Sequence, residues 1–200
     1  MKRSTLDKSL TILAVSLVLI ATSQAAASIT IDFESFPIPG PYLDSYTEQG
    51  VTFSASGGGG ALWASEGPNG TLGLLDMNIP HKELRADISP GATFVSVELG
   101  DYDQDSDRLF LEVFDAADNL IGYTDLVIPE TFVGMETLSL SAPNISYAVF
   151  GARDAGKGSS VYADNFTFEE IAQVIPSPGA IMLGSIGVAV VGWLRRRRTL

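Results

Sequence analysis

The sequence contains no cysteine and only one histidine, His81. Without cysteine the chain has no disulfides, no thiolate nucleophile and no cysteine-ligated zinc, and one histidine cannot form a histidine cluster for zinc. It also lacks a glycine-rich phosphate loop motif and a serine nucleophile elbow. We therefore expect no catalytic residues and no enzymatic activity. A glycoside hydrolase ranks last among the alternatives, because carboxylates are abundant but have no specific spacing.

Basic residues are scarce in the centre of the chain. Residues 28–175 contain five Lys or Arg against 23 Asp or Glu, a net charge of 5 − 23 = −18, whereas the whole chain carries −12. Nucleic acid and anionic lipid bind to cationic patches, so a surface this acidic disfavours both and favours divalent cations. Since it has no disulfides, a domain of this size depends on its hydrophobic core, on a metal ion, or on both.

Long hydrophobic runs occur only near the two ends. The N-terminus has a charged start, Met1-Lys2-Arg3, then an apolar run over 10–21, then small residues over 23–27. The apolar run is shorter than the roughly 20 residues that a spanning helix needs. This pattern predicts a secretory signal peptide over 1–27, removed by signal peptidase after Ala25 or Ala27.

The C-terminal segment, 173–200, has three parts. Its first part contains Pro176, Ser177 and Pro178. The two prolines end any strand that continues from the body. An apolar stretch over 179–194 follows and predicts a transmembrane helix. Four arginines then favour the cytoplasmic side, so the body lies outside: Arg195, Arg196, Arg197 and Arg198.

These parts, combined with a signal peptide, resemble the PEP-CTERM sorting domain. The resemblance covers about the last 27 residues, with Pro176-Ser177-Pro178 in place of the family's usual Pro-Glu-Pro. It implies an exported protein that is held in the inner membrane by its tail and cut near the motif by an exosortase, in a bacterium that makes exopolysaccharide. A plain membrane anchor without processing stays open, because topology rules alone produce the same three parts.

Period-2 alternation of apolar and polar residues dominates the body, 28–172. Residues 116–119 predict the turn of a hairpin. We predict an all-β fold, an antiparallel β-sandwich of jelly-roll type, in which the strands around Phe33 and Phe166 lie side by side. The alternating segments are 28–34, 50–54, 94–99, 109–115, 120–123, 135–140, 145–151 and 161–168.

The order of three short motifs resembles the galactose-binding-like and carbohydrate-binding-module jelly rolls. The motifs are Ile31-Asp32-Phe33-Glu34, then Gly100-Asp101-Tyr102-Asp103 leading into 109–115, then Ala163-Asp164-Asn165-Phe166-Thr167-Phe168. In those jelly rolls a structural calcium ion is often held between the first and last strands. The resemblance therefore implies a calcium site formed by Asp32 or Glu34 with Asp164 and Asn165. The alternative is that these polar residues are only the exposed positions of a sheet.

A second calcium candidate is the run Asp101-Tyr102-Asp103-Gln104-Asp105-Ser106-Asp107. Its carboxylates repel one another unless water or a cation screens them, and calcium takes six to eight oxygen ligands. We predict metal ligands at Asp101, Asp103 and Asp105. A solvated acidic loop is the alternative.

One tryptophan, Trp63, follows the run Gly57-Gly58-Gly59-Gly60 in a stretch expected to be loop. Its ring can stack on a sugar or cap the core, and capping is the commoner use. We name Trp63 as the possible glycan contact.

We therefore expect a non-enzymatic protein of the cell surface or extracellular matrix, sorted by an exosortase and associated with exopolysaccharide or a biofilm. No cofactor is expected apart from structural calcium. The alternative is a carbohydrate-binding module protein.

Overall fold

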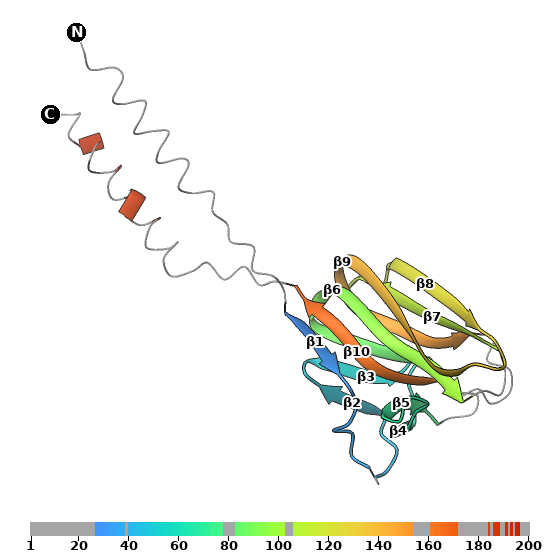
Figure 1. The fold of residues 1–200 in the computed structure, drawn as a ribbon. Helices are drawn as coiled ribbons and strands as arrows, with labels where there is room; N and C mark the ends of the chain where they lie inside the picture. The colour runs from blue at the N-terminus through green and yellow to red at the C-terminus, as the bar shows by residue number, and fades with distance from the viewer. Residues whose placement is uncertain are drawn as a thin grey trace.

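The computed structural model describes residues 27–38, 40–77, 83–102, 106–153 and 161–171, together with Gly184, 186–188, Val191, Trp193, Arg195 and Arg196. Ten strands form the body, and every pairing between them is antiparallel (Figure 1). They are β1 (Ser28–Ile31), β2 (Ser45–Glu48), β3 (Val51–Ala55), β4 (Leu62–Glu66), β5 (Leu72–Asp76), β6 (Leu84–Tyr102), β7 (Asp107–Phe114), β8 (Leu120–Ile128), β9 (Val133–Arg153) and β10 (Tyr162–Glu170).

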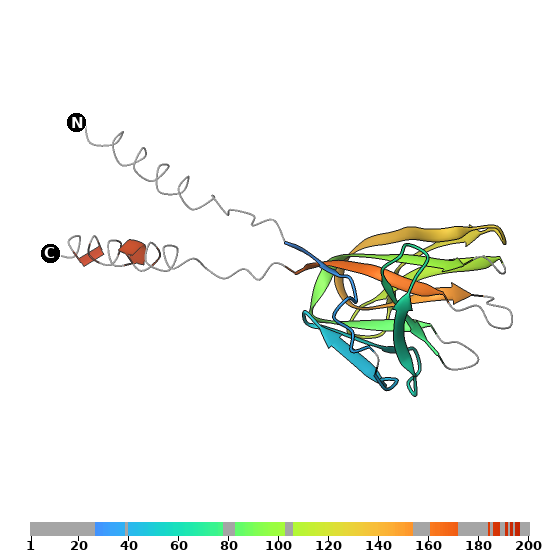
Figure 2. The ribbon, with the colours of Figure 1, turned by 60° about the horizontal axis from the view of Figure 1, so that its bottom comes forward.

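Two long strands, β6 and β9, run through both layers of the sandwich (Figures 1 and 2). Residues 84–88 of β6 pair with β3, whereas its residues from 92 onward pair with β10. In β9, residues 147–153 pair with β7. Both strands change register beside a left-handed residue, Gly91 (φ 126°) in β6 and Asn144 (φ 60°) in β9. A first sheet therefore contains β4, β5, β10, β1 and the far halves of β6 and β9. A second sheet runs in the order β2-β3-β6-β9-β7-β8.

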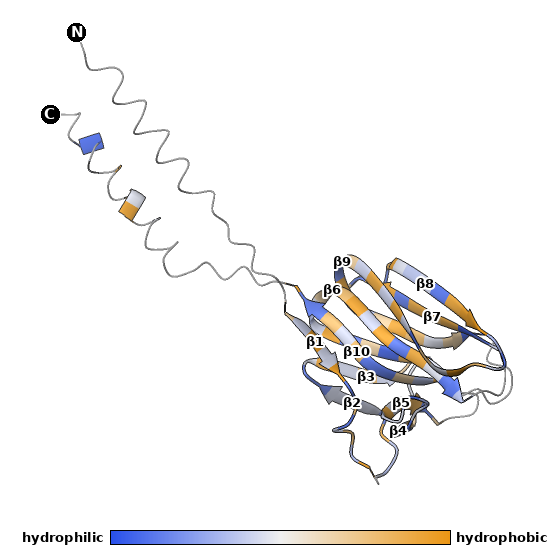
Figure 3. Cartoon of the chain, viewed as in Figure 1, coloured by the Kyte–Doolittle hydropathy of each residue, from blue (hydrophilic) through white to orange (hydrophobic). Residues whose placement is uncertain are grey.

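Apolar and polar residues alternate along several of the strands (Figure 3), and the buried ones build the core between the two sheets. In β3, Val51 and Phe53 are fully buried, while Thr52 and Ser54 are half-buried. The rings of Phe53 from the second sheet and Phe166 from the first meet edge-on, with centroids 5.2 Å apart. Phe150 packs on the same Phe166 ring at 5.6 Å. Aromatic contacts of this kind hold the sandwich together without disulfides.

The prediction of an all-β antiparallel fold is confirmed. The first and last strands lie side by side, with Ser28 opposite Glu169 and Ile31 opposite Phe166. The hairpin of β7 and β8 closes around Asp115, whose carboxylate accepts hydrogen bonds from Ala117 and Asn119. These bonds, that of the Asn119 side chain first, lower the pKa of Asp115.

The prediction that the stretch around Trp63 is a loop is wrong. It forms β4, because its backbone pairs with β5 along five residues. The segments 135–140 and 145–151 were expected as separate strands but form the single bent strand β9.

The signal peptide, 1–27, lies almost entirely outside the described residues, as do Pro176, Ser177, Pro178, Arg197 and Arg198. Arg195, Arg196 and the six other described residues of the C-terminal segment are helical and exposed. Within the part of the chain that the structure describes, no helix is long and apolar enough to cross a membrane. The predicted span over 179–194 falls mostly on residues outside that part.

Candidate functional site

The outward side of the second sheet carries an unusual set of side chains for a solvated surface. Along β7, Leu109, Leu111 and Val113 point into the core, and the residues between them point outward. We call this side the outer face. It is formed by Arg85, Asp87, Arg108, Phe110, Glu112, Phe114, Tyr123, Asp125, Tyr147 and Arg153.

Two aromatic residues of the outer face are buried although they lie outside the core. Phe110 is 1% exposed and Tyr147 is 8% exposed, and neither belongs to the core cluster between the sheets. Neighbouring charged and aromatic side chains cover them instead. The outer face is therefore an organised polar and aromatic layer.

The first half of this layer is a stack of four side chains. The Phe114 and Tyr147 rings are parallel, with centroids 4.7 Å apart. The Arg85 guanidinium carbon lies 3.6 Å from the centroid of the Tyr147 ring, a cation–π contact. Asp87 holds the guanidinium through hydrogen bonds from Nε and Nη2 to its carboxylate, at 2.6 to 3.1 Å. Each of the four side chains contacts the next, so these contacts restrict the positions of all four.

The surroundings of Arg85 and Tyr147 keep both side chains protonated, so both are hydrogen-bond donors. The hydrogen bonds to Asp87 raise the pKa of Arg85, which stays charged. Burial raises the pKa of Tyr147 above its ordinary value of 10.0, and the hydrogen bond that its hydroxyl donates to Asp118 at 3.1 Å raises it further. Tyr147 is therefore a neutral phenol at physiological pH.

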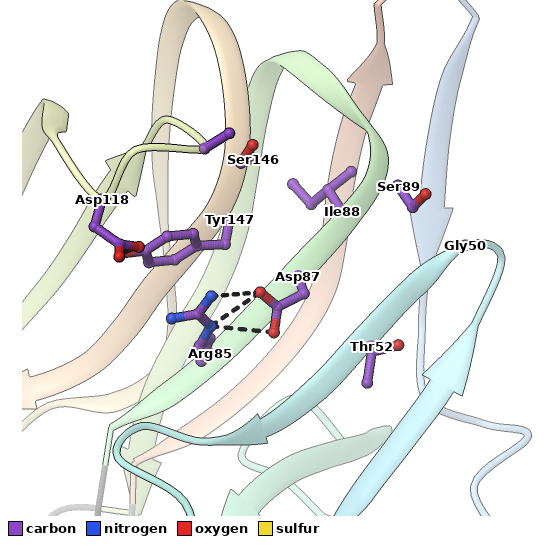
Figure 4. A pocket seen from close by; sticks show the side chains of 10 residues that line it. Gly50, Thr52, Arg85, Asp87, Ile88, Ser89, Asp118, Ser146 and Tyr147 are labelled. Atoms are coloured by element: carbon purple, nitrogen blue, oxygen red, sulfur yellow. Dashed lines mark hydrogen bonds and ion pairs between the residues drawn. The ribbon is translucent and has the colours of Figure 1, made fainter.

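A cleft of about 340 Å³ opens over this stack (Figure 4). Arg85, Asp87 and Tyr147 line it from β6 and β9. The β2–β3 hairpin lines it through Gly50 and Thr52, and the β7–β8 turn lines it through Ala116 and Asp118. Hydroxyl groups of Thr52, Ser89 and Ser146 also belong to the lining. The cleft therefore combines carboxylates, a guanidinium and hydroxyl-bearing residues beside the buried Tyr147 ring.

The second half of the outer face also combines cation–π contacts with ion pairs. The Arg153 guanidinium lies 4.4 Å from the Phe110 ring centroid and 5.7 Å from that of Tyr123, and it forms an ion pair with Glu112. Arg108 forms an ion pair with Asp125 at 2.9 Å.

The two halves are continuous. Arg85 lies opposite Val149, Val149 opposite Glu112, and Glu112 opposite Tyr123. Four strands at a spacing of about 4.8 Å make this row about 14 Å wide. Tyr123, at its far end, is 43% exposed and presents its ring to solvent. An extended ligand can therefore contact the cleft and Tyr123 together.

The predicted acids of the first and last strands gather elsewhere, around the β4–β5 turn. Asp164 is fully buried, and its carboxylate accepts hydrogen bonds from Asn69 Nδ2 (2.9 Å), Thr71 Oγ1 (2.6 Å) and the Asn165 backbone N–H (2.7 Å). Glu34 accepts a hydrogen bond from the Leu72 N–H at 2.8 Å. Thus Glu34 and Asp164 both hold this turn.

The other two polar residues of that prediction have local partners. Asp32 is exposed and accepts a hydrogen bond from the Glu34 N–H at 3.2 Å. Asn165 donates to Glu98 at 2.9 Å.

These contacts bear on whether a cation fits. Both oxygens of Asp164 already accept hydrogen bonds from the protein, and among the described residues no three His, Asp or Glu side chains are arranged to hold a metal ion. In the acidic run, Asp101 is buried and accepts a hydrogen bond from the Tyr102 N–H, and Asp103 and Asp105 fall outside the described residues. Calcium stays a prediction.

Trp63 lies on the other sheet. It is half-buried on β4, and its ring meets the exposed Tyr42 edge-on at 5.3 Å. It therefore does not belong to the outer face. Sequence reasoning missed the residues that do. The available signal was β7 itself, since Phe110 and Phe114 are apolar at positions that alternate with the core positions.

Comparison with protein-family models gives no match, and no curated protein matches the sequence. Similar solved structures include the CBM22-1 xylan-binding domain from Paenibacillus barcinonensis Xyn10C, at 13% identity and a TM-score of 0.42, covering 76% of this chain and 99% of that one. A family 29 carbohydrate-binding module, CBM29-2, has 14% identity and a TM-score of 0.39, covering 75% and 99%.

The K3 cleaved adhesin domain of Lys-gingipain from Porphyromonas gingivalis has 12% identity and a TM-score of 0.46, covering 72% of this chain and all of that one. An arabinose-bound GH51 α-L-arabinofuranosidase has 14% identity and a TM-score of 0.44, and the chain spans only 26% of its length. Similarities of this size do not assign a ligand.

Replacing Asp164 by alanine should lower the free energy of unfolding by about 2–4 kcal/mol, because the hydrogen bonds that Asn69 and Thr71 donate to this buried carboxylate are lost. Urea denaturation of the full chain in detergent measures this change. Glu130→Ala, in an exposed turn, is the matched control and should stay within about 0.5 kcal/mol of wild type. Equal effects of the two variants would contradict the assigned role.

The calcium hypothesis predicts that EGTA lowers the thermal midpoint of the full chain and that excess Ca²⁺ restores it, because an ion bound only by the folded state stabilises that state. Differential scanning calorimetry at fixed ionic strength checks this. A midpoint that does not respond to chelator or to added Ca²⁺ would remove the hypothesis.

Proposed function

We propose that the outer face binds polysaccharide, and that the protein is a non-enzymatic polysaccharide-binding protein exported to the cell envelope. The observation that carries the proposal is the cleft lined by Arg85, Asp87 and Tyr147, which brings a guanidinium, carboxylates and hydroxyl-bearing residues together beside the buried Tyr147 ring. Sugars offer hydroxyls that both donate and accept hydrogen bonds. A site that supplies donors and acceptors in fixed positions is suited to them.

The fixed position of the Arg85 guanidinium supports binding at this face. The guanidinium of Arg85 is fixed by Asp87 on one side and by the Tyr147 ring on another. These side chains are therefore already ordered in the folded protein. A ligand does not lose binding free energy to order them. The exposed ring of Tyr123 adds an apolar surface on which a sugar can stack.

The carboxylates of the outer face favour binding over turnover. Asp87, Glu112 and Asp125 each form an ion pair with an arginine of the same face. Glycoside hydrolysis instead needs a carboxylic acid that gives its proton to the leaving oxygen. We therefore keep the proposal to binding.

The proposed location depends on the two terminal segments. Ser28 lies opposite Glu169, so β1 begins and β10 ends at the same end of the sandwich (Figure 1). A signal peptide over 1–27 and an anchor over 179–194 would hold the body outside the inner membrane by that end. The resemblance of the tail to a PEP-CTERM domain supports exosortase processing and an association with exopolysaccharide.

Tyr123→Ala should weaken polysaccharide binding about tenfold, because loss of an interfacial aromatic contact costs about 1.4 kcal/mol or more. Affinity electrophoresis of the full chain against a panel of polysaccharides measures the change. Tyr42→Ala is the matched control, since Tyr42 is also exposed (58%) but packs against Trp63 instead of the outer face. If Tyr42→Ala or Trp63→Ala abolished binding and Tyr123→Ala did not, the site would be at β4.

Mass spectrometry of the exported protein should find a mature C-terminus near Pro178, because an exosortase cuts near this motif in the family that the tail resembles. A Pro178→Ala variant should accumulate with an intact tail. Recovery of Arg198 on all of the surface-exposed protein would instead favour a plain membrane anchor.

A further inference from the structure

The basic residues of the body that the structure describes are not spread over its surface. Residues 28–175 hold five, of which Lys82 and Lys157 lie outside the described residues. The three that the structure describes, Arg85, Arg108 and Arg153, all lie on the outer face, although they come from β6, β7 and β9. On a body with a net charge of −18, this concentration marks the outer face as electrostatically distinct.

Each of these arginines is paired with a carboxylate of the same face. Asp87 binds Arg85 at 2.6 Å, Asp125 binds Arg108 at 2.9 Å, and Glu112 binds Arg153. The three pairs balance in charge, and Asp118 at the edge of the cleft adds one further carboxylate. The outer face is therefore close to neutral, while the remainder of the body is strongly acidic.

We propose that the polysaccharide bound by the outer face is neutral, an inference that rests on the proposed function. An anionic polymer would bring uronate or sulfate groups against guanidinium groups that already have carboxylate partners, and against the negative field of the whole body. Every ion pair it replaced would leave a protein carboxylate without its cation, on a surface where cations are scarce.

Hydroxyl groups avoid this conflict. A guanidinium has five N–H donors and a carboxylate about four acceptor sites, so an ion pair keeps hydrogen-bonding capacity after its two partners have met. Adjacent sugar hydroxyls can then donate to Asp87 and accept from Arg85 without breaking the pair. Binding of this kind releases no counterions and depends little on salt.

The test compares polymers of the two classes on the full chain in detergent. Isothermal titration with a neutral β-glucan and a neutral galactomannan should show binding by at least one of them, with an affinity that changes less than about twofold between 50 and 500 mM NaCl. Polygalacturonate should bind at least about tenfold more weakly than that neutral polymer.

A charge-switch variant makes the test sharper. Asp87→Asn combined with Glu112→Gln removes the carboxylate partners of Arg85 and Arg153 and should give binding to polygalacturonate that falls steeply with salt. Asp44→Asn combined with Glu130→Gln is the control and should give no such binding, because it removes two exposed charges that are not among the residues of the outer face. Each single variant is measured as well, with a melting curve, in case the double variant does not fold.

The outcomes separate the two claims. If wild-type protein binds polygalacturonate as tightly as the neutral polymers, or more tightly, the inference is wrong and the proposed function stands. If it binds neither class, the proposed function fails and the inference fails with it. Binding of a neutral polymer alone, together with gain of polygalacturonate binding in the charge-switch variant, supports both.

Discussion

The pairing of β6 with β9 is the interaction on which the other features of the body depend. The two strands pair on both sides of a common bend, from Leu84 opposite Phe150 at one end to Tyr102 opposite Val133 at the other. Because both strands continue from one sheet into the other, they close the sandwich and set the register of β3, β7 and β10. The two continuous strands link the sheets, as disulfides do in many secreted proteins.

The same pairing builds the outer face. It sets Asp87 opposite Tyr147 and Arg85 opposite Val149, and β7 then sets Phe114 opposite Tyr147. Side chains on opposite strands and on diagonal positions are within reach of one another, so the aromatic, cationic and anionic groups pack as one layer. The chemistry of the face is therefore a direct consequence of the strand register.

The sequence predicted the fold where alternation was clear and failed where it was not. β3 alternates strictly and was predicted, whereas β5 reads Leu72-Gly73-Leu74-Leu75-Asp76 and has no period of two. The four glycines before Trp63 predict a loop, yet pairing with β5 makes this segment the strand β4. The neighbouring first and last strands were predicted because both carry aromatic and acidic residues.

The outer face could not be predicted in the same way. Arg85 and Tyr147 are 62 positions apart, and the pairing that joins them appears only in the folded sheet. Runs of acids and a tryptophan beside glycines stand out in the sequence, whereas the arginines are far apart in it. Arg85 contacts the ring of Tyr147, which comes from a distant segment of the chain, and Arg153 forms its ion pair with Glu112, which is 41 positions away.

The most direct test of the central claim is to locate the ligand on the protein. Amide chemical-shift mapping of the ¹⁵N-labelled chain with a neutral oligosaccharide would do this residue by residue. The account predicts that the shifts concentrate on β6 around Arg85 and Asp87, on β9 around Tyr147, and on β8 around Tyr123. Shifts confined to β4 and β5, around Trp63, would contradict it.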